Sequence, residues 1–377
     1  MSTHRKIEIV SPGNRLTVQD LGRRGSQRFG VSVSGVLDLQ AAVYANRLVG
    51  NPVSSAVLES TFGGAVIRFE EDTKVAVTGA EVDVTIDEFP TTNWETLIAP
   101  AGSELSVAIP SEGLYSYIAL EGGIDVPEVL GSRSTHVASG IGGFQGRALS
   151  EGDELVLGSE MESGSRPRAG TTTDPDLLPA CRDDARRIRV IAGPQLDAFD
   201  DEAKATFFGS TFSVSNLTDR QGARLEGAEV PAIGGKHDIV SDPAYMGAVQ
   251  IPADGKPIIL LADRQPTGGY AKIASVITAD LPAVVQKTPG SQFGFELIDV
   301  AAAQELAAEF RRSIYEQPLR APERVHASTV AVDGESYNVE LVLPNATQFG
   351  ELDDGIVYAT IDEGRELAAK IETSINE

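Results

Sequence analysis

Apolar and polar residues alternate with a period of two along much of the first third of the chain. The alternation is clearest in short runs separated by turn residues, at 75–77, 82–86, 105–109 and 115–120. A period of two places successive side chains on opposite faces of a strand, and several short strands at this spacing are typical of a β barrel or sandwich. The sequence therefore predicts a first unit built mainly of antiparallel strands.

Two segments carry apolar residues at helical spacing instead. The first follows Asp38, a residue type that favours helix N-caps, and stops at the Gly-Asn-Pro of residues 50–52. The second follows Asp299 and ends near Tyr315. We therefore expect a mainly β (α+β) protein with a few short helices.

Composition divides the chain into regions. A stretch rich in Ser, Thr, Pro, Gly and Asp at 160–184 is typical of an inter-domain linker, and Arg-Ala-Pro at 320–322 marks a second break. The predicted regions are a first β unit at 1–160, a linker at 161–185, a second β unit at 186–318 and a C-terminal appendage at 319–377. The pattern within the appendage predicts hairpin strands at 330–332 and 337–343, a strand at 357–360 and an acidic helix ending near Ile375, which together make a small βα unit.

An internal similarity links the two β units. Ile-Pro at 109–110 and 251–252 each begin a turn that ends in Gly and leads through an apolar strand to a Gly-Gly pair, at 122–123 and 268–269. This similarity predicts two related units, with chance resemblance of two turns as the alternative.

The polar segment at 261–272 concentrates the largest number of candidate functional groups. It follows an apolar run at 257–260 that predicts a buried strand. Its Gly-Gly pair would let the backbone adopt positive φ and let a ligand approach the amides. The guanidinium of Arg264 suits a carboxylate, a phosphate or a polarised carbonyl. The alternative is a tight turn held by an Asp–Arg pair.

The charge balance narrows the class of partner. A net charge of −24, from 55 acidic and 31 basic residues, opposes binding to nucleic acid and to anionic membranes. It favours a halophilic protein whose self-repulsion is screened by salt, with an acidic mesophilic enzyme as the alternative. No apolar run approaches the ~20 residues of a membrane span and none resembles a signal peptide, so we expect a cytoplasmic protein. The single cysteine, Cys181, lies beside acidic residues that disfavour a thiolate, and we expect it to be a bystander.

Several catalytic motifs are absent. Gly-Gly-Lys at 234–236 is followed by His237 rather than Ser or Thr, so the sequence contains no P-loop. It also contains no His-Glu-x-x-His, no paired cysteines and no Gly-x-Ser-x-Gly elbow. We therefore expect no metal ligands, with a carboxylate-held Mg²⁺ as the alternative.

A set of loops rich in Arg, Asp, Gln and Gly remains, each after a β segment. Such loops offer guanidiniums, amides and fixed carboxylates, which suit catalysis by positioning and by stabilising charge on an oxygen. For each arginine, an ion pair with a nearby acid is the alternative. The candidate catalytic residues are Asp20, Arg133, Asp263 and Arg264. The candidate substrate-binding residues are Arg23, Ser134, Thr135, Gly142, Gly143, Arg220, Gln250, Gln265, Thr267, Gly268, Gly269, Tyr270 and Lys272.

These motifs occur in an order that matches a known family. The matching segments include residues 17–23, 121–124, 131–135, 247–250 and 263–270. Over about residues 7–315, the chain strongly resembles the allophanate-hydrolase-subunit-2-like family, which includes the C subunit of 5-oxoprolinase, KipA and half of the carboxyltransferase region of urea carboxylase.

The resemblance implies two tandem cyclophilin-like β-barrel units and a companion KipI-type B subunit, with the active site near their shared surface. A LamB/YcsF-type A subunit would complete an ATP-dependent 5-oxoprolinase, with ATP and Mg bound in the assembled complex. One alternative is a carboxyltransferase subunit of a biotin-dependent, urea-type carboxylase. Another is a non-catalytic, KipA-like antagonist of a kinase inhibitor.

The sequence departs from the family in three places. Pro266 replaces the usual Thr and removes an amide donor, and Gln221 stands where Met is common. The chain after about residue 320 lies outside the resemblance. Residues 332–339 are similar to the start of a biotinyl domain, but the Met-Lys-Met acceptor is absent.

Overall fold

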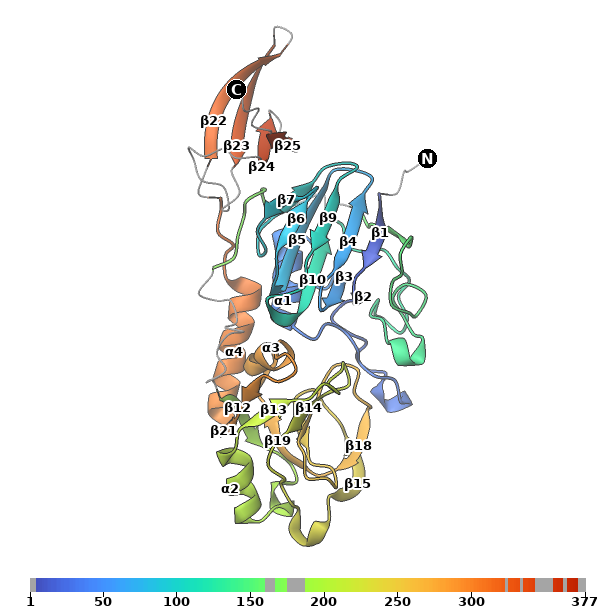
Figure 1. Cartoon of the computed structure of the whole chain (residues 1–377), viewed down its shortest axis with the longest axis vertical. Coiled ribbons are helices and arrows are strands. Elements are labelled where there is room, and N and C mark those ends of the chain that lie inside the picture. The colour runs from blue at the N-terminus through green and yellow to red at the C-terminus, as the bar shows by residue number, and fades with distance from the viewer. Residues whose placement is uncertain are drawn as a thin grey trace.

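The computed structural model describes residues 5–159, 167–174 and 187–322, together with the backbone of four strands between residues 325 and 371. The chain forms an elongated molecule with one β unit in the middle, a second at one end and a small sheet at the other (Figure 1). Cys181 and most of the predicted linker lie outside the described residues.

The first unit consists of two antiparallel sheets packed on a shared core. The larger sheet has the order β11-β1-β4-β9-β6-β7 and the smaller has the order β2-β3-β10-β5-β8. Their strands are β1 (Lys6–Pro12), β2 (Arg15–Gln19), β3 (Val57–Thr61), β4 (Ala65–Phe69), β5 (Thr73–Glu81), β6 (Val84–Ile86), β7 (Phe89–Thr91), β8 (Leu97–Ala99), β9 (Glu104–Val107), β10 (Glu112–Leu120) and β11 (Glu154–Val156). The predicted alternation is visible in β9, where Leu105 and Val107 are buried and the residues between them are partly exposed.

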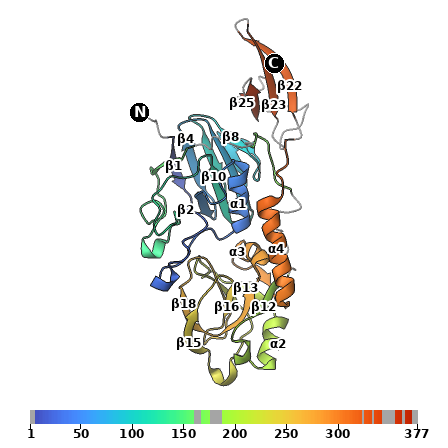
Figure 2. The ribbon, with the colours of Figure 1, turned by 180° about the vertical axis from the view of Figure 1, so that it is seen from behind.

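Helix α1 (Leu39–Leu48) covers one face of the smaller sheet (Figure 2). It begins as predicted, because the Asp38 side chain accepts a hydrogen bond from the amide of Ala41. The Tyr44 hydroxyl donates to the Ser313 carbonyl of α4 (Val300–Glu316), which joins the helix to the second unit. Asp299 caps α4 in the predicted way.

The second unit is one eight-stranded sheet that curls into a nearly closed barrel (Figure 1). Its order is β20-β13-β14-β17-β16-β19-β12-β21, and β15 and β18 form a separate two-stranded arm. The strands are β12 (Ile188–Ala192), β13 (Phe212–Val214), β14 (Gly222–Glu226), β15 (Asp238–Pro243), β16 (Ala248–Gln250), β17 (Ile258–Leu260), β18 (Thr267–Tyr270), β19 (Lys272–Val276), β20 (Gln292–Phe293) and β21 (Phe295–Leu297). A stack of Phe207 on Phe295, 4.5 Å between ring centroids, fills the core under α2 (Asp201–Gly209).

The remaining helices are short. They are α3 (Leu281–Val285) and the 3-10 helices η1 (Gln27–Phe29), η2 (Val137–Ser139), η4 (Leu196–Ala198), η5 (Ile233–Gly235) and η6 (Thr278–Asp280). None of the helices in the described residues is long and apolar enough to cross a membrane. The mainly β fold with few helices, in two β units, is confirmed, whereas the predicted domain boundaries stay predictions.

The C-terminal appendage differs from the prediction. Four strands form an antiparallel sheet: β22 (Val325–Val332), β23 (Glu335–Val342), β24 (Gly355–Ile361) and β25 (Arg365–Ile371). The predicted helix is wrong over 365–371, which pairs with β24 along its whole length. This segment is rich in good helix formers, and strand pairing overrides that weak local preference. The appendage is therefore a β sheet in its described part, and Ile375 lies outside that part.

Candidate functional site

The segment at 261–272 is a loop in its first half and a strand in its second. Gly268 and Gly269 lie in β18, which pairs with β15, and neither has a positive φ, so the positive φ predicted for this Gly-Gly pair is wrong. Gly122 and Gly123 do have positive φ values, 90° and 69°, and the two pairs are therefore not equivalent. Close approach explains Gly268 instead, because a Cβ there would overlap Nε2 of Gln250.

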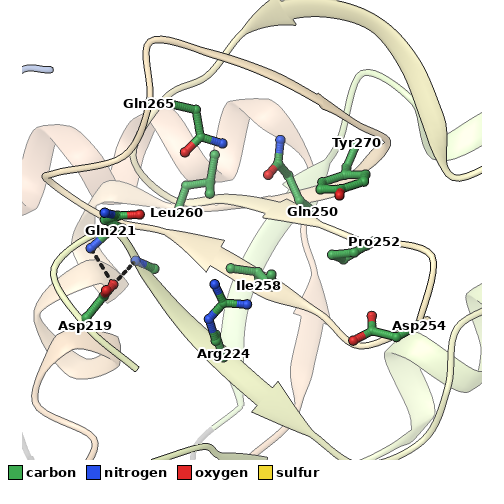
Figure 3. Close-up of a pocket in the computed structure, with 11 residues that line it drawn as sticks. Asp219, Gln221, Arg224, Gln250, Pro252, Asp254, Ile258, Leu260, Gln265 and Tyr270 are labelled. Atoms are coloured by element: carbon green, nitrogen blue, oxygen red, sulfur yellow. Dashed lines mark hydrogen bonds between the residues drawn. The ribbon is translucent and has the colours of Figure 1, made fainter. Parts of the chain in front are cut away.

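A polar pocket opens between the barrel and the β18 arm (Figure 3). Its volume is about 250 Å³, the size for a small ligand. It brings together three of the predicted substrate-binding residues, Gln250, Gln265 and Tyr270. The other lining residues are Asp219, Gln221, Gly222, Arg224, Pro252, Asp254, Ile258 and Leu260.

Gln250 is the least satisfied polar group of this pocket. Its side chain is 2% exposed, and Nε2 has no hydrogen-bond partner among the described residues. An unpaired buried donor costs about 1–3 kcal/mol, a cost that a bound ligand or a water molecule can remove. Figure 3 shows the amides of Gln250 and Gln265 beside each other on one wall.

Arg224 supplies a cation on the opposite wall (Figure 3). Its guanidinium forms no ion pair or hydrogen bond with any part of the chain that the structure describes. The Asp219 carboxylate is occupied, since Oδ1 accepts the amides of Gln221 at 2.8 Å and Gly222 at 3.2 Å. Amide groups that both donate and accept, next to a free guanidinium, complement a small N–C=O compound that carries an anionic group.

Arg224 and Asp254 were not among the predicted site residues. Strand periodicity could have indicated Arg224, because side chains two residues apart in a strand lie on the same face of the sheet. Gly222 and Arg224 are two residues apart in β14 and both line the pocket.

Arg220 lies between the pocket residues Asp219 and Gln221 but points away from the pocket, into the interface between the units. Its Nε donates to Oδ2 of Asp263 at 2.9 Å, Nη1 pairs with Oε1 of Glu59 in the first unit, and Nη2 donates to the Gly35 carbonyl at 2.6 Å. Burial acts to lower the pKa of Arg220, but the carboxylates of Glu59 and Asp263 outweigh it and raise the pKa. Asp263 is thus held by Arg220 of another loop, and not by Arg264 of its own segment.

The interface network continues from Glu59. Its Oε2 accepts the hydroxyl of Tyr117 at 2.9 Å, and that hydroxyl accepts the amide of Asp38 at 2.8 Å. Gln286 of the second unit donates to Oδ2 of Asp38 at 3.0 Å. Burial raises the pKa of both Asp38 and Tyr117. Buried hydrogen bonds and ion pairs thus run along the contact between the two units.

Arg264 and Lys272, both predicted site residues, do not line the pocket. The Arg264 guanidinium is buried against the carbonyls of Ala244 and Leu261, at 3.3 and 3.0 Å. Burial, together with the charge of Arg24, lowers its pKa to about 10. Lys272 is fully buried and its Nζ pairs with Asp242.

The predicted residues of the first unit form a separate cluster around Asp20. The Asp20 carboxylate accepts hydrogen bonds from the amides of Gly22 and Arg133 and from the hydroxyls of Ser132 and Ser134. Through these four donors, the Asp20 carboxylate joins the loop that contains Gly22 to the loop at 132–134.

The other members of this cluster have structural contacts as well. The Arg133 side chain turns outward to Glu128, 2.6 Å away. The buried Arg23 donates to the Ser134 carbonyl, and burial lowers the pKa of its guanidinium. Thr135 donates to the Val18 carbonyl, and Gly142 and Gly143 pack against Ser134 and Thr135 with positive φ.

The loop that follows Asp20 reaches the second unit. The Ser34 amide donates to the Ala262 carbonyl at 3.1 Å, and the Ser32 hydroxyl donates to the Arg264 carbonyl at 2.8 Å. The structure therefore brings one predicted loop of the first unit, the one after Asp20, into contact with the 261–264 segment of the second. Only Gln250, Gln265 and Tyr270 of the predicted residues line the pocket beside that interface.

The chain thus contains two β units joined by a buried ionic interface, with a polar pocket in the second. The chain belongs to the family described as carboxyltransferase domain, subdomains A and B, whose model matches residues 29–297. The predicted resemblance is thereby confirmed.

Named relatives cover most of this chain. It is 37% identical to the C subunit of 5-oxoprolinase from Escherichia coli over 77% of this chain and 90% of that protein, and 35% identical to urea amidolyase of Lachancea kluyveri over 80% of this chain and 17% of that protein. The crystal structure of TTHA0988 matches 78% of this chain with a TM-score of 0.69 at 32% identity, and the chain spans 56% of it. The K. lactis urea amidolyase structure matches 97% of this chain with a TM-score of 0.77 at 28% identity, and the chain spans 23% of it.

Proposed function

We propose that this chain is a subunit of an ATP-dependent 5-oxoprolinase, which opens 5-oxo-L-proline to L-glutamate. In this proposal it acts with a KipI-type B subunit and a LamB/YcsF-type A subunit, in the cytoplasm. The 37% identity to the C subunit of a 5-oxoprolinase, over nearly that protein's full length, supports the assignment. The observation that carries it is a polar pocket in which the amides of Gln250 and Gln265 lie beside each other, with the Arg224 guanidinium on the opposite wall.

The pocket offers a partner for each polar group of a 5-oxoproline molecule. The side-by-side amides of Gln250 and Gln265 can between them donate to the lactam oxygen and accept the ring N–H. The substrate carboxylate faces the free guanidinium of Arg224. A donor held at the lactam oxygen also stabilises the negative charge that develops there when the ring amide is attacked.

The lining of this pocket does not suit ATP and Mg. The carboxylates of Asp219 and Asp254 line the pocket, and Arg224 is the one cation among its described lining residues, an arrangement that repels a triphosphate. No group of three His, Cys, Asp or Glu residues that could hold a metal ion occurs in the described ranges. We therefore assign nucleotide binding in the proposed complex to the partner subunits.

Reconstitution tests this function directly. The chain is mixed with its two partner subunits, and glutamate release from 5-oxo-L-proline is measured with and without ATP. Release that requires ATP and all three proteins is the expected result. No release from the complete mixture, with all three proteins folded, would contradict the proposal.

One observation favours a second candidate, a carboxyltransferase subunit that uses carboxybiotin. The match to the K. lactis urea amidolyase structure extends over 97% of this chain, whereas the match to TTHA0988 covers 78%. The ureido groups of urea and biotin are also N–C=O groups, so the chemistry of the pocket suits them too. Under this proposal, carboxyl transfer requires a biotinylated carrier protein and stops when avidin is added.

A further inference from the structure

The pocket wall and the inter-unit interface are built from the same two short loops. In the first loop, Asp219 and Gln221 line the pocket while Arg220 points the opposite way, to Glu59. In the second, Gln265 lines the pocket while Asp263 pairs with Arg220. Each loop therefore contributes residues both to the ligand side and to the interface side.

Backbone hydrogen bonds join these loops to each other. The Leu261 amide donates to the Gln221 carbonyl at 2.9 Å, and the Asp263 amide donates to the Arg220 carbonyl at 2.8 Å. With the Arg220–Asp263 ion pair added, the two loops are joined into one block. The block is attached to the first unit where Arg220 meets Glu59 and the Gly35 carbonyl, and also by the hydrogen bonds from Ser32 and Ser34 described above.

We propose that Arg220 is a positioning residue, which transmits the placement of the first unit, through Glu59, to the pocket wall that carries Gln221 and Gln265. The affinity of the pocket then depends on an ion pair whose acidic partner, Glu59, belongs to the other unit and is not a lining residue. This inference rests on the proposed function for the identity of the ligand only.

The planar shape of the guanidinium explains why this role requires arginine. Arg220 contacts Asp263, Glu59 and Gly35 from three nitrogens of one rigid plane, so fixing any two partners fixes the third. A lysine keeps the charge but offers no planar fork, and it cannot hold all three partners in this geometry.

A purely structural role predicts a different outcome. In that case, loss of the ion pair lowers stability and leaves the pocket unchanged. The Arg189–Asp280 pair provides a matched control, because Asp280 is fully buried, the Nη2–Oδ1 distance is 2.6 Å, and neither residue lines the pocket.

Calorimetric titration of the full-length chain with 5-oxo-L-proline tests the inference. We expect Arg220→Lys and Glu59→Gln each to raise Kd about tenfold, the size typical of directly coupled groups. We expect Arg189→Lys to lower the melting temperature about as much as Arg220→Lys does, but to change Kd by less than about twofold. Wild-type Kd in folded Glu59→Gln protein would overturn the inference, and this variant also serves if Arg220→Lys does not fold.

A measurement without ligand separates this inference from the proposed function. If the wild-type chain does not bind 5-oxo-L-proline, the assigned substrate fails, and amide hydrogen exchange then tests the positioning role. We expect the amides of Leu261 and Asp263 to lose protection in Glu59→Gln and to keep it in Arg189→Lys. Unchanged protection of both amides in Glu59→Gln would overturn the positioning role.

Discussion

Arg220 of the second unit and Glu59 of the first form a buried ion pair across the interface, 161 residues apart in sequence. Both side chains are at most 6% exposed. Both charges are removed from water by this burial, so each is stabilised mainly by its charged partners.

Removing one member of this pair is expected to destabilise the protein strongly. Glu59→Ala leaves the Arg220 charge buried beside Asp263 alone, and we expect a loss of about 3–5 kcal/mol in the free energy of unfolding. Urea denaturation measures it. A double-mutant cycle with Arg220→Met separates the pair from its surroundings, and additive losses would show that the two side chains are not coupled.

Replacing Gln250 with Leu is expected to separate stability from ligand binding. The substitution removes the unpartnered Nε2, so we expect the free energy of unfolding to rise by about 1 kcal/mol. The same change removes one of the two amides proposed to bind the lactam, so Kd for 5-oxo-L-proline should rise at least about tenfold. Thermal denaturation and calorimetric titration of one preparation give both values. Unchanged affinity would exclude Gln250 from the binding site.

The two glycines of β18 provide a matched pair of substitutions. In Gly268→Ala the new methyl group would overlap the end of the Gln250 side chain, whereas in Gly269→Ala the nearest atom is 3.7 Å away. The end of a glutamine side chain can move at small cost, so both variants should fold. We expect Gly268→Ala to weaken ligand binding and Gly269→Ala to bind as the wild type does. Equal affinities in a titration would show that the position of the Gln250 amide does not matter.

Asp153 is expected to make stability fall in acid. Hydrogen bonds from Arg147, at 2.7 and 2.8 Å, and from the Ser150 amide lower the pKa of its carboxyl. A carboxyl whose folded-state pKa is below 3.8 stabilises the protein above pH 3.8, and this contribution disappears as the pH falls through the folded-state value.

Comparison with Asp153→Asn isolates this contribution. We expect the variant to be less stable than the wild type by about 1 kcal/mol at pH 7, and we expect this difference to disappear as the pH falls through the folded-state pKa of Asp153, where the carboxyl loses its charge. Denaturation curves across this range measure the difference. A difference that does not change with pH would show that the Asp153 charge is not responsible.

Salt is expected to stabilise the chain. A net charge of −24 gives a self-repulsion that is screened over about 10 Å at 0.1 M salt and about 3 Å at 1 M. The melting temperature should therefore rise between these concentrations of KCl. Sucrose of equal osmolarity serves as the control for exclusion effects, and an equal rise in sucrose would argue against a halophilic design.

Local features of the fold were predictable from the sequence because their determinants are adjacent in the chain. The caps at Asp38 and Asp299 depend on an amide three residues away, and both are present. The strand at 365–371 was not predictable in this way. Its residues favour a helix, and only the pairing with β24 decides the outcome.

Three of the candidate residues share one pocket, but the partners of the other candidate residues were not predictable from the sequence. Gln250, Gln265 and Tyr270 meet in the pocket as expected of a shared site. Asp263 was a candidate catalyst, but its carboxylate is bound by Arg220, 43 residues earlier in the chain. Asp20 is likewise occupied by donors from a loop more than 110 residues away. Partners at such separations are set by the packing of strands, and no local pattern encodes them.

The small C-terminal sheet lies at the end of the first unit that faces away from the second (Figure 1). The pocket belongs to the second unit, so the whole first unit stands between the two. A partner that bound the sheet would therefore contact this chain away from the pocket, with the first unit between the two.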